Sequence, residues 1–137
     1  LPDNFAAAKN FMRTMEMRVK AKCSVCIYPE AHIWPFYTKI RPFPDTSFKY
    51  PVQYKIPAFC FTNVYQKRHF SKNPRMITYV DGPFFADASL SAKDQRKALR
   101  DAVYEKMCQR SLLNNVELIK YIKKTDSQIG ENGENHD

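Results

Sequence analysis

The placement of proline is the strongest constraint on how this chain folds. Pro35, Pro42 and Pro44 all fall within residues 31–46. A proline removes a backbone donor and clashes with the preceding helical turn. We therefore predict that residues 31–46 form an ordered loop without a regular element. Residues 47–54 can form one or two helical turns, stressed by a proline of their own.

Helical periodicity appears outside this proline-rich part. Residues 4–20 carry apolar side chains at spacings of three and four, which predicts an amphipathic helix with that stripe in the core. Ser91 can cap a second helix over 92–110. Asn114 can cap a last short helix over 116–124. The stripe of the first helix consists of Phe5, Ala8, Met12, Met15 and Val19.

Three short segments predict β-strands: two apolar runs at 23–28 and 57–65, and a segment of alternating character at 75–81. Two of them are apolar enough for burial on both faces of a sheet. A basic connection over 66–74 joins the second strand to the third. The order of elements indicates an α/β fold, a mixed β-sheet flanked by helices. Because three strands are few for such a sheet, we expect further sequence before Leu1.

Charge is distributed unevenly along the chain. From Lys9 to Arg75 there are 13 Lys and Arg against three acidic residues, which gives a net charge of +10. Such a field attracts nucleic acid, anionic lipid headgroups or an acidic protein, or it is simply a solvated surface. Residues 125–137 hold four acids and no base, and we predict a disordered acidic tail there.

The Cys23-Ser-Val-Cys26 sequence suggests a metal or redox site at first sight. Residues three apart on a strand face opposite sides, so these cysteines cannot easily share a metal or a disulfide. We expect them to be small buried apolar residues, and we expect no metal site. All four cysteines are expected as free thiols, typical of a reducing compartment.

Glu30 follows the first predicted strand and a proline. Active sites of open α/β sheets gather at the carboxyl ends of strands, which favours a functional carboxylate. The alternative is a surface carboxylate paired with Lys39 or Arg41. Both interpretations stay open on spacing alone.

Several motifs, in this order and spacing, resemble the C-terminal half of the PlsC-type glycerolipid acyltransferases (1-acyl-glycerol-3-phosphate acyltransferases). That family has a strand ending in Phe-Pro-Glu-Gly-Thr-Arg, a Pro-Phe-Lys stretch, a Val-Pro strand, a hairpin strand closing with Gly-x-Pro and a last helix. The matching segments here are Tyr28-Pro29-Glu30, Pro42-Phe43 with Ser47-Phe48-Lys49, Ile56-Pro57-Ala58-Phe59, Tyr79-Val80-Asp81-Gly82-Pro83 and LRDAVYEKM. The resemblance runs from about Phe11 to Met107 and implies that residues 1–124 are the C-terminal part of an acyltransferase domain.

The resemblance also implies roles for individual residues. The family's Gly-Thr-Arg is Ala31-His32-Ile33 here, so the arginine that binds acceptor phosphate in the family is missing from its place. Glu30 would hydrogen-bond acceptor hydroxyls, and nearby bases would hold an anionic headgroup. His32 would donate to the acceptor or fill space beside Trp34. The substrate-binding residues expected from the resemblance are Glu30, His32, Lys39, Arg41, Ser47 and Lys49.

The family's catalytic pair, His-x4-Asp, is not found in this chain. Tyr37 stands five residues after His32, and Pro74 stands five residues after His69. We therefore expect no catalytic residue within the chain and place the general base in sequence upstream of it. An in-frame His-x4-Asp upstream would support this expectation.

The expected function is transfer of a fatty acyl group from acyl-ACP or acyl-CoA to a lysophospholipid-type acceptor, in phospholipid biosynthesis. No cofactor is expected beyond that thioester donor. The expected location is cytoplasmic, peripheral at the inner face of an anionic membrane. The alternatives are a non-catalytic interaction domain and a nucleic-acid-binding module. In the latter, aromatic residues would stack on bases. These residues would be Tyr37, Phe43, Tyr54, Tyr65 and Phe70.

Overall fold

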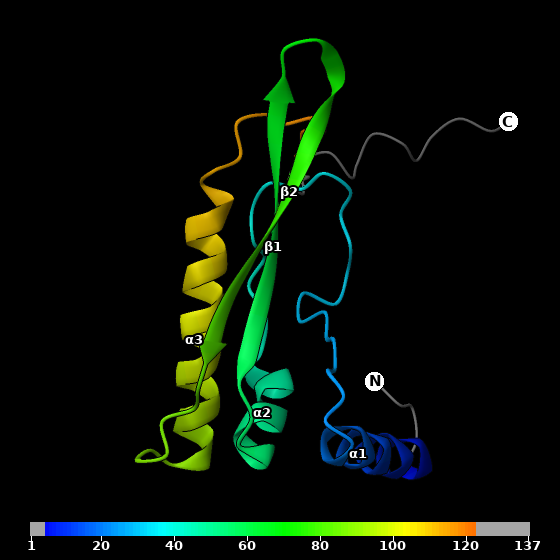
Figure 1. The fold of residues 1–137 in the computed structure, drawn as a ribbon, viewed down its shortest axis with the longest axis vertical. Coiled ribbons are helices and arrows are strands. Elements are labelled where there is room, and N and C mark those ends of the chain that lie inside the picture. Colours follow the sequence, from blue (N-terminus) through cyan, green and yellow to red (C-terminus); the bar gives the residue numbers. More distant parts are fainter. Residues whose placement is uncertain (1–4, 123–137) are drawn as a thin grey trace, which may run out of the picture.

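The computed structural model describes residues 5–122, which form a small α/β fold (Figure 1). The coarse prediction of fold class is confirmed, but the sheet within these residues has two antiparallel strands rather than a larger mixed set. The elements are α1 (Phe5–Lys20), the 3-10 helix η1 (Asp45–Phe48), α2 (Lys49–Tyr54), β1 (Ala58–Arg68), β2 (Ser71–Phe84) and α3 (Ala92–Ser111). The predicted acidic tail, 125–137, lies outside the described residues.

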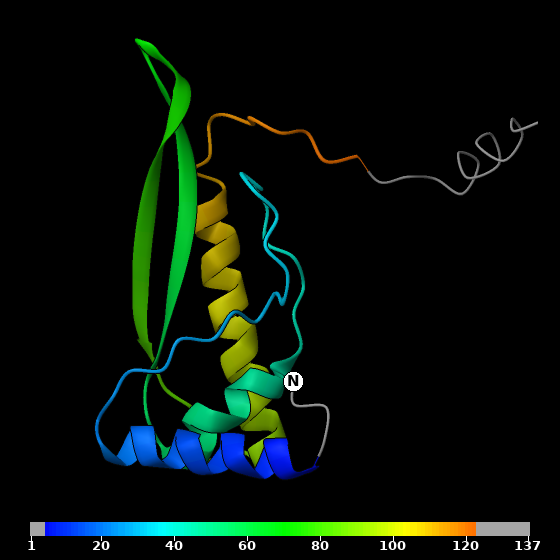
Figure 2. The same ribbon diagram turned by 90° about the vertical axis from the view of Figure 1, so that its right-hand side faces the viewer.

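Strands β1 and β2 form one long hairpin that turns at His69 and Phe70. Both strands are longer than predicted. Residues 66–68 belong to β1 and residues 71–74 to β2, although the sequence had predicted a basic connection over 66–74. Both strands of a two-stranded sheet are edges, so β2 tolerates Pro74, whose missing donor breaks no further ladder. The turn therefore lies far from the body of the molecule, as both views show (Figures 1 and 2).

Helix α3 packs along one face of the hairpin and builds the core with it. Ser91 caps the helix as predicted, since its hydroxyl accepts a hydrogen bond from the Asp94 backbone N–H at 3.2 Å. Three of its residues are buried at helical spacing, and their neighbours come from β1, η1 and the loop before η1. The core residues are Phe43, Phe48, Cys60, Leu99, Val103 and Met107. The loop therefore lies on the α3 side of the hairpin (Figure 2).

The opposite face of the hairpin is uncovered within the described residues. Along β1, buried Cys60, Thr62 and Val64 alternate with exposed Phe59 and Phe61. The prediction of burial on both faces is therefore wrong for β1, since α3 covers one side only. Phe61 pairs with Val80 of β2, which is also exposed.

Helix α1 matches the predicted span but only part of the predicted burial. Of its apolar stripe Met15 is buried and Ala8, Met12 and Val19 are half-buried, while Phe5 is 86% exposed. The ring of Phe11 meets that of Tyr50 at 6.0 Å, which ties the helix to α2. The stripe is thus the covered face of the helix except at Phe5, although none of its residues belongs to the main core cluster.

Two predicted elements do not form. Residues 23–28 are an exposed irregular segment rather than a buried strand, because no sheet edge pairs with their backbone within the described residues. Cys23 and Cys26 are exposed, so their expected burial is wrong, although both are free thiols. The helix predicted over 116–124 is absent from 116–122, and residues 123 and 124 lie outside the described range.

Candidate functional site

Glu30 and Arg41 form the centre of the candidate site. The Arg41 backbone N–H donates to Glu30 Oε2 at 3.0 Å, and Arg41 Nε lies 3.6 Å from the same oxygen. Both side chains are largely covered, with 27% of Glu30 and 20% of Arg41 exposed. One carboxylate oxygen is thus fixed by two groups of the same residue.

The Arg41 guanidinium closes the segment that carries Glu30 into a compact loop. Its Nη2 donates to the Glu30 carbonyl at 3.0 Å and also to the His32 carbonyl. Its carbon Cζ lies 4.6 Å from the centre of the Trp34 ring. The arginine thereby orients Glu30, and His32 enters the site through its backbone oxygen.

Two polar atoms of this pair remain available. Within residues 5–122, neither Glu30 Oε1 nor Arg41 Nη1 has a hydrogen-bond partner. One is an acceptor and the other a charged donor. A ligand carrying both a hydroxyl and an anionic group matches this pair chemically.

The backbone at Ala31 is strained. The Ala31 N–H donates to the Tyr28 carbonyl at 3.2 Å, and the His32 N–H donates to the Glu30 carbonyl at 2.8 Å. This γ-turn is centred on Ala31, whose φ is 64°, a left-handed value that favours glycine. The turn reverses the chain immediately after the carboxylate.

Aromatic rings flank the site, and the sequence patterns did not indicate this. Trp34 stacks on Tyr121 with ring centres 5.0 Å apart, and Tyr37 meets both rings edge-on. The Tyr121 hydroxyl donates to the Pro35 carbonyl at 2.7 Å. These contacts hold the C-terminal segment extended against the loop, which explains in part why no helix forms over 116–122.

The charge of Glu30 also acts on Tyr104 of α3. The pKa of Tyr104 is raised, chiefly by a hydrogen bond with the Cys108 thiol and by burial, with the negative charge of Glu30 contributing further. The Tyr104 ring packs edge-on against Phe43 at 5.4 Å between centres. Tyr104 also packs against the core cluster that contains Phe43.

The remaining predicted residues are not brought to this pair. Lys39 lies at a separate groove of about 490 Å³ with Asn114 and Glu117. Lys49 places its ammonium group 5.0 Å from the Tyr50 ring, and Ser47 is half-buried in η1. Within residues 5–122, no hydrogen bond or ion pair joins these three to Glu30 or Arg41.

Asn114 and Asn115 have a role that local pattern did not indicate. The Tyr65 backbone N–H donates to Asn114 Oδ1 and the Lys67 backbone N–H donates to Asn115 Oδ1, both at 2.7 Å. The Asn115 N–H returns a bond to the Tyr65 carbonyl at 3.1 Å. Instead of capping a helix, the two asparagines bind the edge of β1. Asn114 Nδ2 also donates to the Thr38 carbonyl at 3.1 Å and so ties the loop to that edge.

The part of the chain that the structure describes contains no helix long and apolar enough to cross a membrane. Over the same range, no three His, Cys, Asp or Glu side chains gather as metal ligands would.

Comparison with known proteins returns no match: no family model fits the chain, and no curated protein or solved structure is significantly similar to it.

Proposed function

We propose that this chain forms the acceptor-binding part of an acyltransferase. The reaction would move a fatty acyl group from acyl-ACP or acyl-CoA to the hydroxyl of a lysophospholipid-type acceptor. The proposal rests on the resemblance to PlsC-type acyltransferases together with the geometry around Glu30.

One observation carries the proposal. The family motif Pro-Glu-Gly corresponds to Pro29-Glu30-Ala31, and Ala31 has the left-handed φ of 64° that glycine adopts without strain. The backbone here thus has a shape that a glycine at this position would adopt without strain, although the residue is alanine. A strained turn held directly beside a carboxylate is typical of a functional site rather than of a surface loop.

The available atoms suit the acceptor. Glu30 Oε1 would accept a hydrogen bond from an acceptor hydroxyl, and Arg41 Nη1 would contact the phosphate of the headgroup. Arg41 therefore supplies part of the role of the missing family arginine, while Lys39 and Lys49 act only as components of the wider positive field. That field, +10 between Lys9 and Arg75, would keep the protein at the cytoplasmic face of an anionic membrane and favour an acidic carrier protein.

Binding of lysophosphatidate below its micelle concentration tests the proposal on the 137-residue chain, by titration calorimetry. We expect Glu30→Gln to weaken binding by about tenfold, since a hydrogen bond to a charged group contributes about 1.5–3 kcal/mol. Glu105→Gln is the matched control, because Glu105 is exposed on α3 and its removal changes the charge equally. Circular dichroism of each variant checks that the fold is kept.

Unchanged lysophosphatidate affinity in folded Glu30→Gln would remove Glu30 from the site and refute the proposal. Equal loss in Glu105→Gln would show that the effect is not specific to Glu30, which also contradicts the proposal. The change of charge by itself would strengthen binding of this anionic lipid. In a protein that additionally carries the His-x4-Asp pair, Glu30→Ala should depress acyl transfer strongly without unfolding.

A further inference from the structure

The tip of the hairpin, residues 66–75, presents a fully exposed apolar ring to solvent. Phe70 sits at the turn and is 103% exposed, so its ring contacts almost nothing. Its nearest aromatic neighbour is the His69 ring, tilted by 55° at 6.4 Å between centres. The tip extends past the end of α3 in both views (Figures 1 and 2). Nothing in the described fold requires an apolar side chain here.

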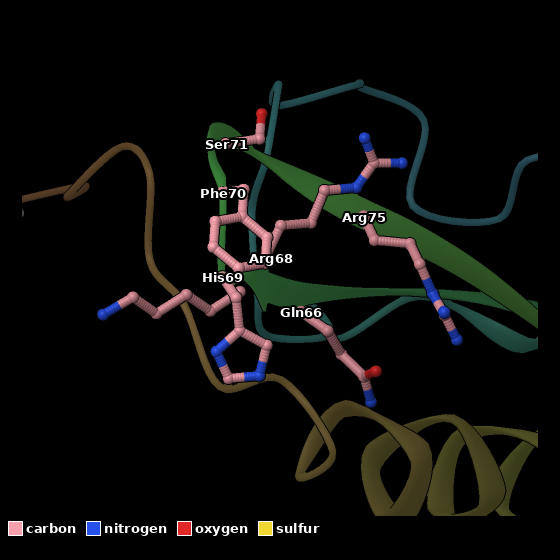
Figure 3. Close-up of a pocket in the computed structure, with 7 residues that line it drawn as sticks. Gln66, Arg68, His69, Phe70, Ser71 and Arg75 are labelled. Atoms are coloured by element: carbon pink, nitrogen blue, oxygen red, sulfur yellow. The ribbon is translucent and has the colours of Figure 1, made fainter.

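Positive charge surrounds this apolar ring. The tip carries four basic residues, and residues 46–80 contain no Asp or Glu. Within residues 5–122 none of the four forms an ion pair. A hollow of about 600 Å³ lies at the turn, lined from Gln66 to Ser71 and by Arg75 (Figure 3). The four basic residues are Lys67, Arg68, Lys72 and Arg75.

We propose that the hairpin tip is the membrane contact of this protein, with an anionic bilayer as its partner. Phe70 enters the boundary between headgroups and acyl chains, and the surrounding bases bind lipid phosphates. Burial of an exposed phenylalanine and attraction of basic side chains to anionic lipid act in the same direction.

The geometry favours a bilayer over a single-stranded nucleic acid. Binding to single strands uses successive aromatic platforms, one for each base. The two exposed rings of the tip, His69 and Phe70, are tilted by 55° to each other and so form no pair of parallel platforms. Tyr65, just before the tip, packs against Phe36 at 5.3 Å between centres. Phe43, another ring considered for stacking, is only 3% exposed. The choice of partner also rests on the proposed function, because a lysophospholipid acceptor reaches the protein from a membrane.

Sedimentation of the 137-residue chain with vesicles tests this inference. The probes are phosphatidylcholine vesicles with and without about one third phosphatidylglycerol, an anionic lipid. We expect Phe70→Ser to lower binding to the anionic vesicles by about tenfold. Arg68→Gln with Lys72→Gln should lower it by about 25-fold, from about fivefold for each base.

Matched controls separate the tip from general charge and exposure. Phe85→Ser removes a ring that is 67% exposed outside the tip, and we expect it to leave vesicle binding unchanged. Lys93→Gln with Lys97→Gln removes two charges from exposed positions on α3 and should change binding by less than about twofold if contact is confined to the tip. Losses in these controls equal to those of the tip variants would overturn the inference.

A second measurement reports insertion directly. In the Trp34→Phe, Phe70→Trp variant the single tryptophan stands at the tip, and brominated lipid should quench its fluorescence. Absence of quenching in vesicle-bound protein would overturn insertion. Phe70-dependent binding of a single-stranded oligonucleotide, tighter than binding to vesicles, would assign the tip to nucleic acid instead.

The two proposals fail separately. The vesicles contain no lysophospholipid, so vesicle binding does not require the Glu30 site. If neither the parent protein nor its variants bind lysophosphatidate, while vesicle binding still depends on the tip, the proposed function alone is refuted. If the tip variants bind vesicles as the parent does, while lysophosphatidate binding is kept, the membrane contact alone is refuted.

Discussion

Replacement of Ala31 by glycine should stabilise the protein. Ala31 has a φ of 64° and is exposed, so the methyl group strains the backbone while contributing no burial. A left-handed conformation costs an L-residue about 1–2 kcal/mol. Glycine removes that strain, but the additional freedom of the unfolded chain offsets about 0.4–1 kcal/mol of the gain. The expected net increase in the free energy of unfolding is about 0.5–1 kcal/mol.

Urea denaturation followed by circular dichroism measures this change. With a slope of about 1–3 kcal/mol per molar urea, the midpoint of Ala31→Gly should rise by about 0.5 M at constant slope. Ala98→Gly is the matched control, because Ala98 is exposed in the interior of α3. There glycine should lower stability by about 1 kcal/mol. A midpoint that falls in Ala31→Gly as it does in Ala98→Gly would refute the strain at Ala31.

Three further predictions concern the framework. Asp81→Asn should make the stability of the protein less sensitive to acid. Hydrogen bonding to the Arg110 guanidinium lowers the pKa of Asp81. The ionised Asp81 therefore stabilises the fold fully above about pH 4, and this stabilisation is lost as the pH falls further. Urea midpoints at pH 7 and pH 3 should therefore differ less in the variant than in the parent, and equal acid dependence would contradict this. Asn114→Ala should lower the free energy of unfolding by about 1–3 kcal/mol, because it leaves half-buried backbone groups unpaired. An unchanged urea midpoint would contradict this. Burial raises the pKa of the Cys60 thiol, whereas Cys23 is exposed. A thiol reagent at pH 8 should therefore label Cys23 much faster than Cys60. Equal labelling rates, measured by mass spectrometry, would disprove the burial.

Local signals predicted local structure well. Helix α3 begins one residue after Ser91, as expected, because the cap and the periodic apolar face act within a few residues of each other. The span of α1 followed from its periodicity in the same way, but the packing of its apolar stripe against the main core did not. Periodicity shows that a helix has an apolar face and cannot show whether another element covers it.

Tertiary context decided the elements that were predicted wrongly. The apolar run 23–28 satisfies every local criterion for a strand, yet a strand forms only where an edge pairs with its backbone. The hairpin strands extend through basic residues and a proline because a two-stranded sheet leaves both edges open to solvent. Local polarity had indicated a loop there.

The candidate site was partly visible in the sequence. Arg41 was one of the two partners considered for Glu30, since the two residues are only 11 apart. The contact of Tyr121 with Pro35 spans 86 residues, and no local pattern reports such a pairing. Arg110 and Asp81, 29 residues apart, were missed for the same reason.

The two asparagines on β1 have a consequence for how the molecule meets its neighbours. Their bonds occupy the strand's outer margin at Tyr65 and Lys67, where an incoming polypeptide would otherwise attach. Margins that remain bare invite β-augmentation by another chain. An additional strand can therefore pair only with the remaining strand edges of the hairpin. Asn115→Ala should lengthen the edge of β1 that is free to pair with a strand of a second copy of the protein.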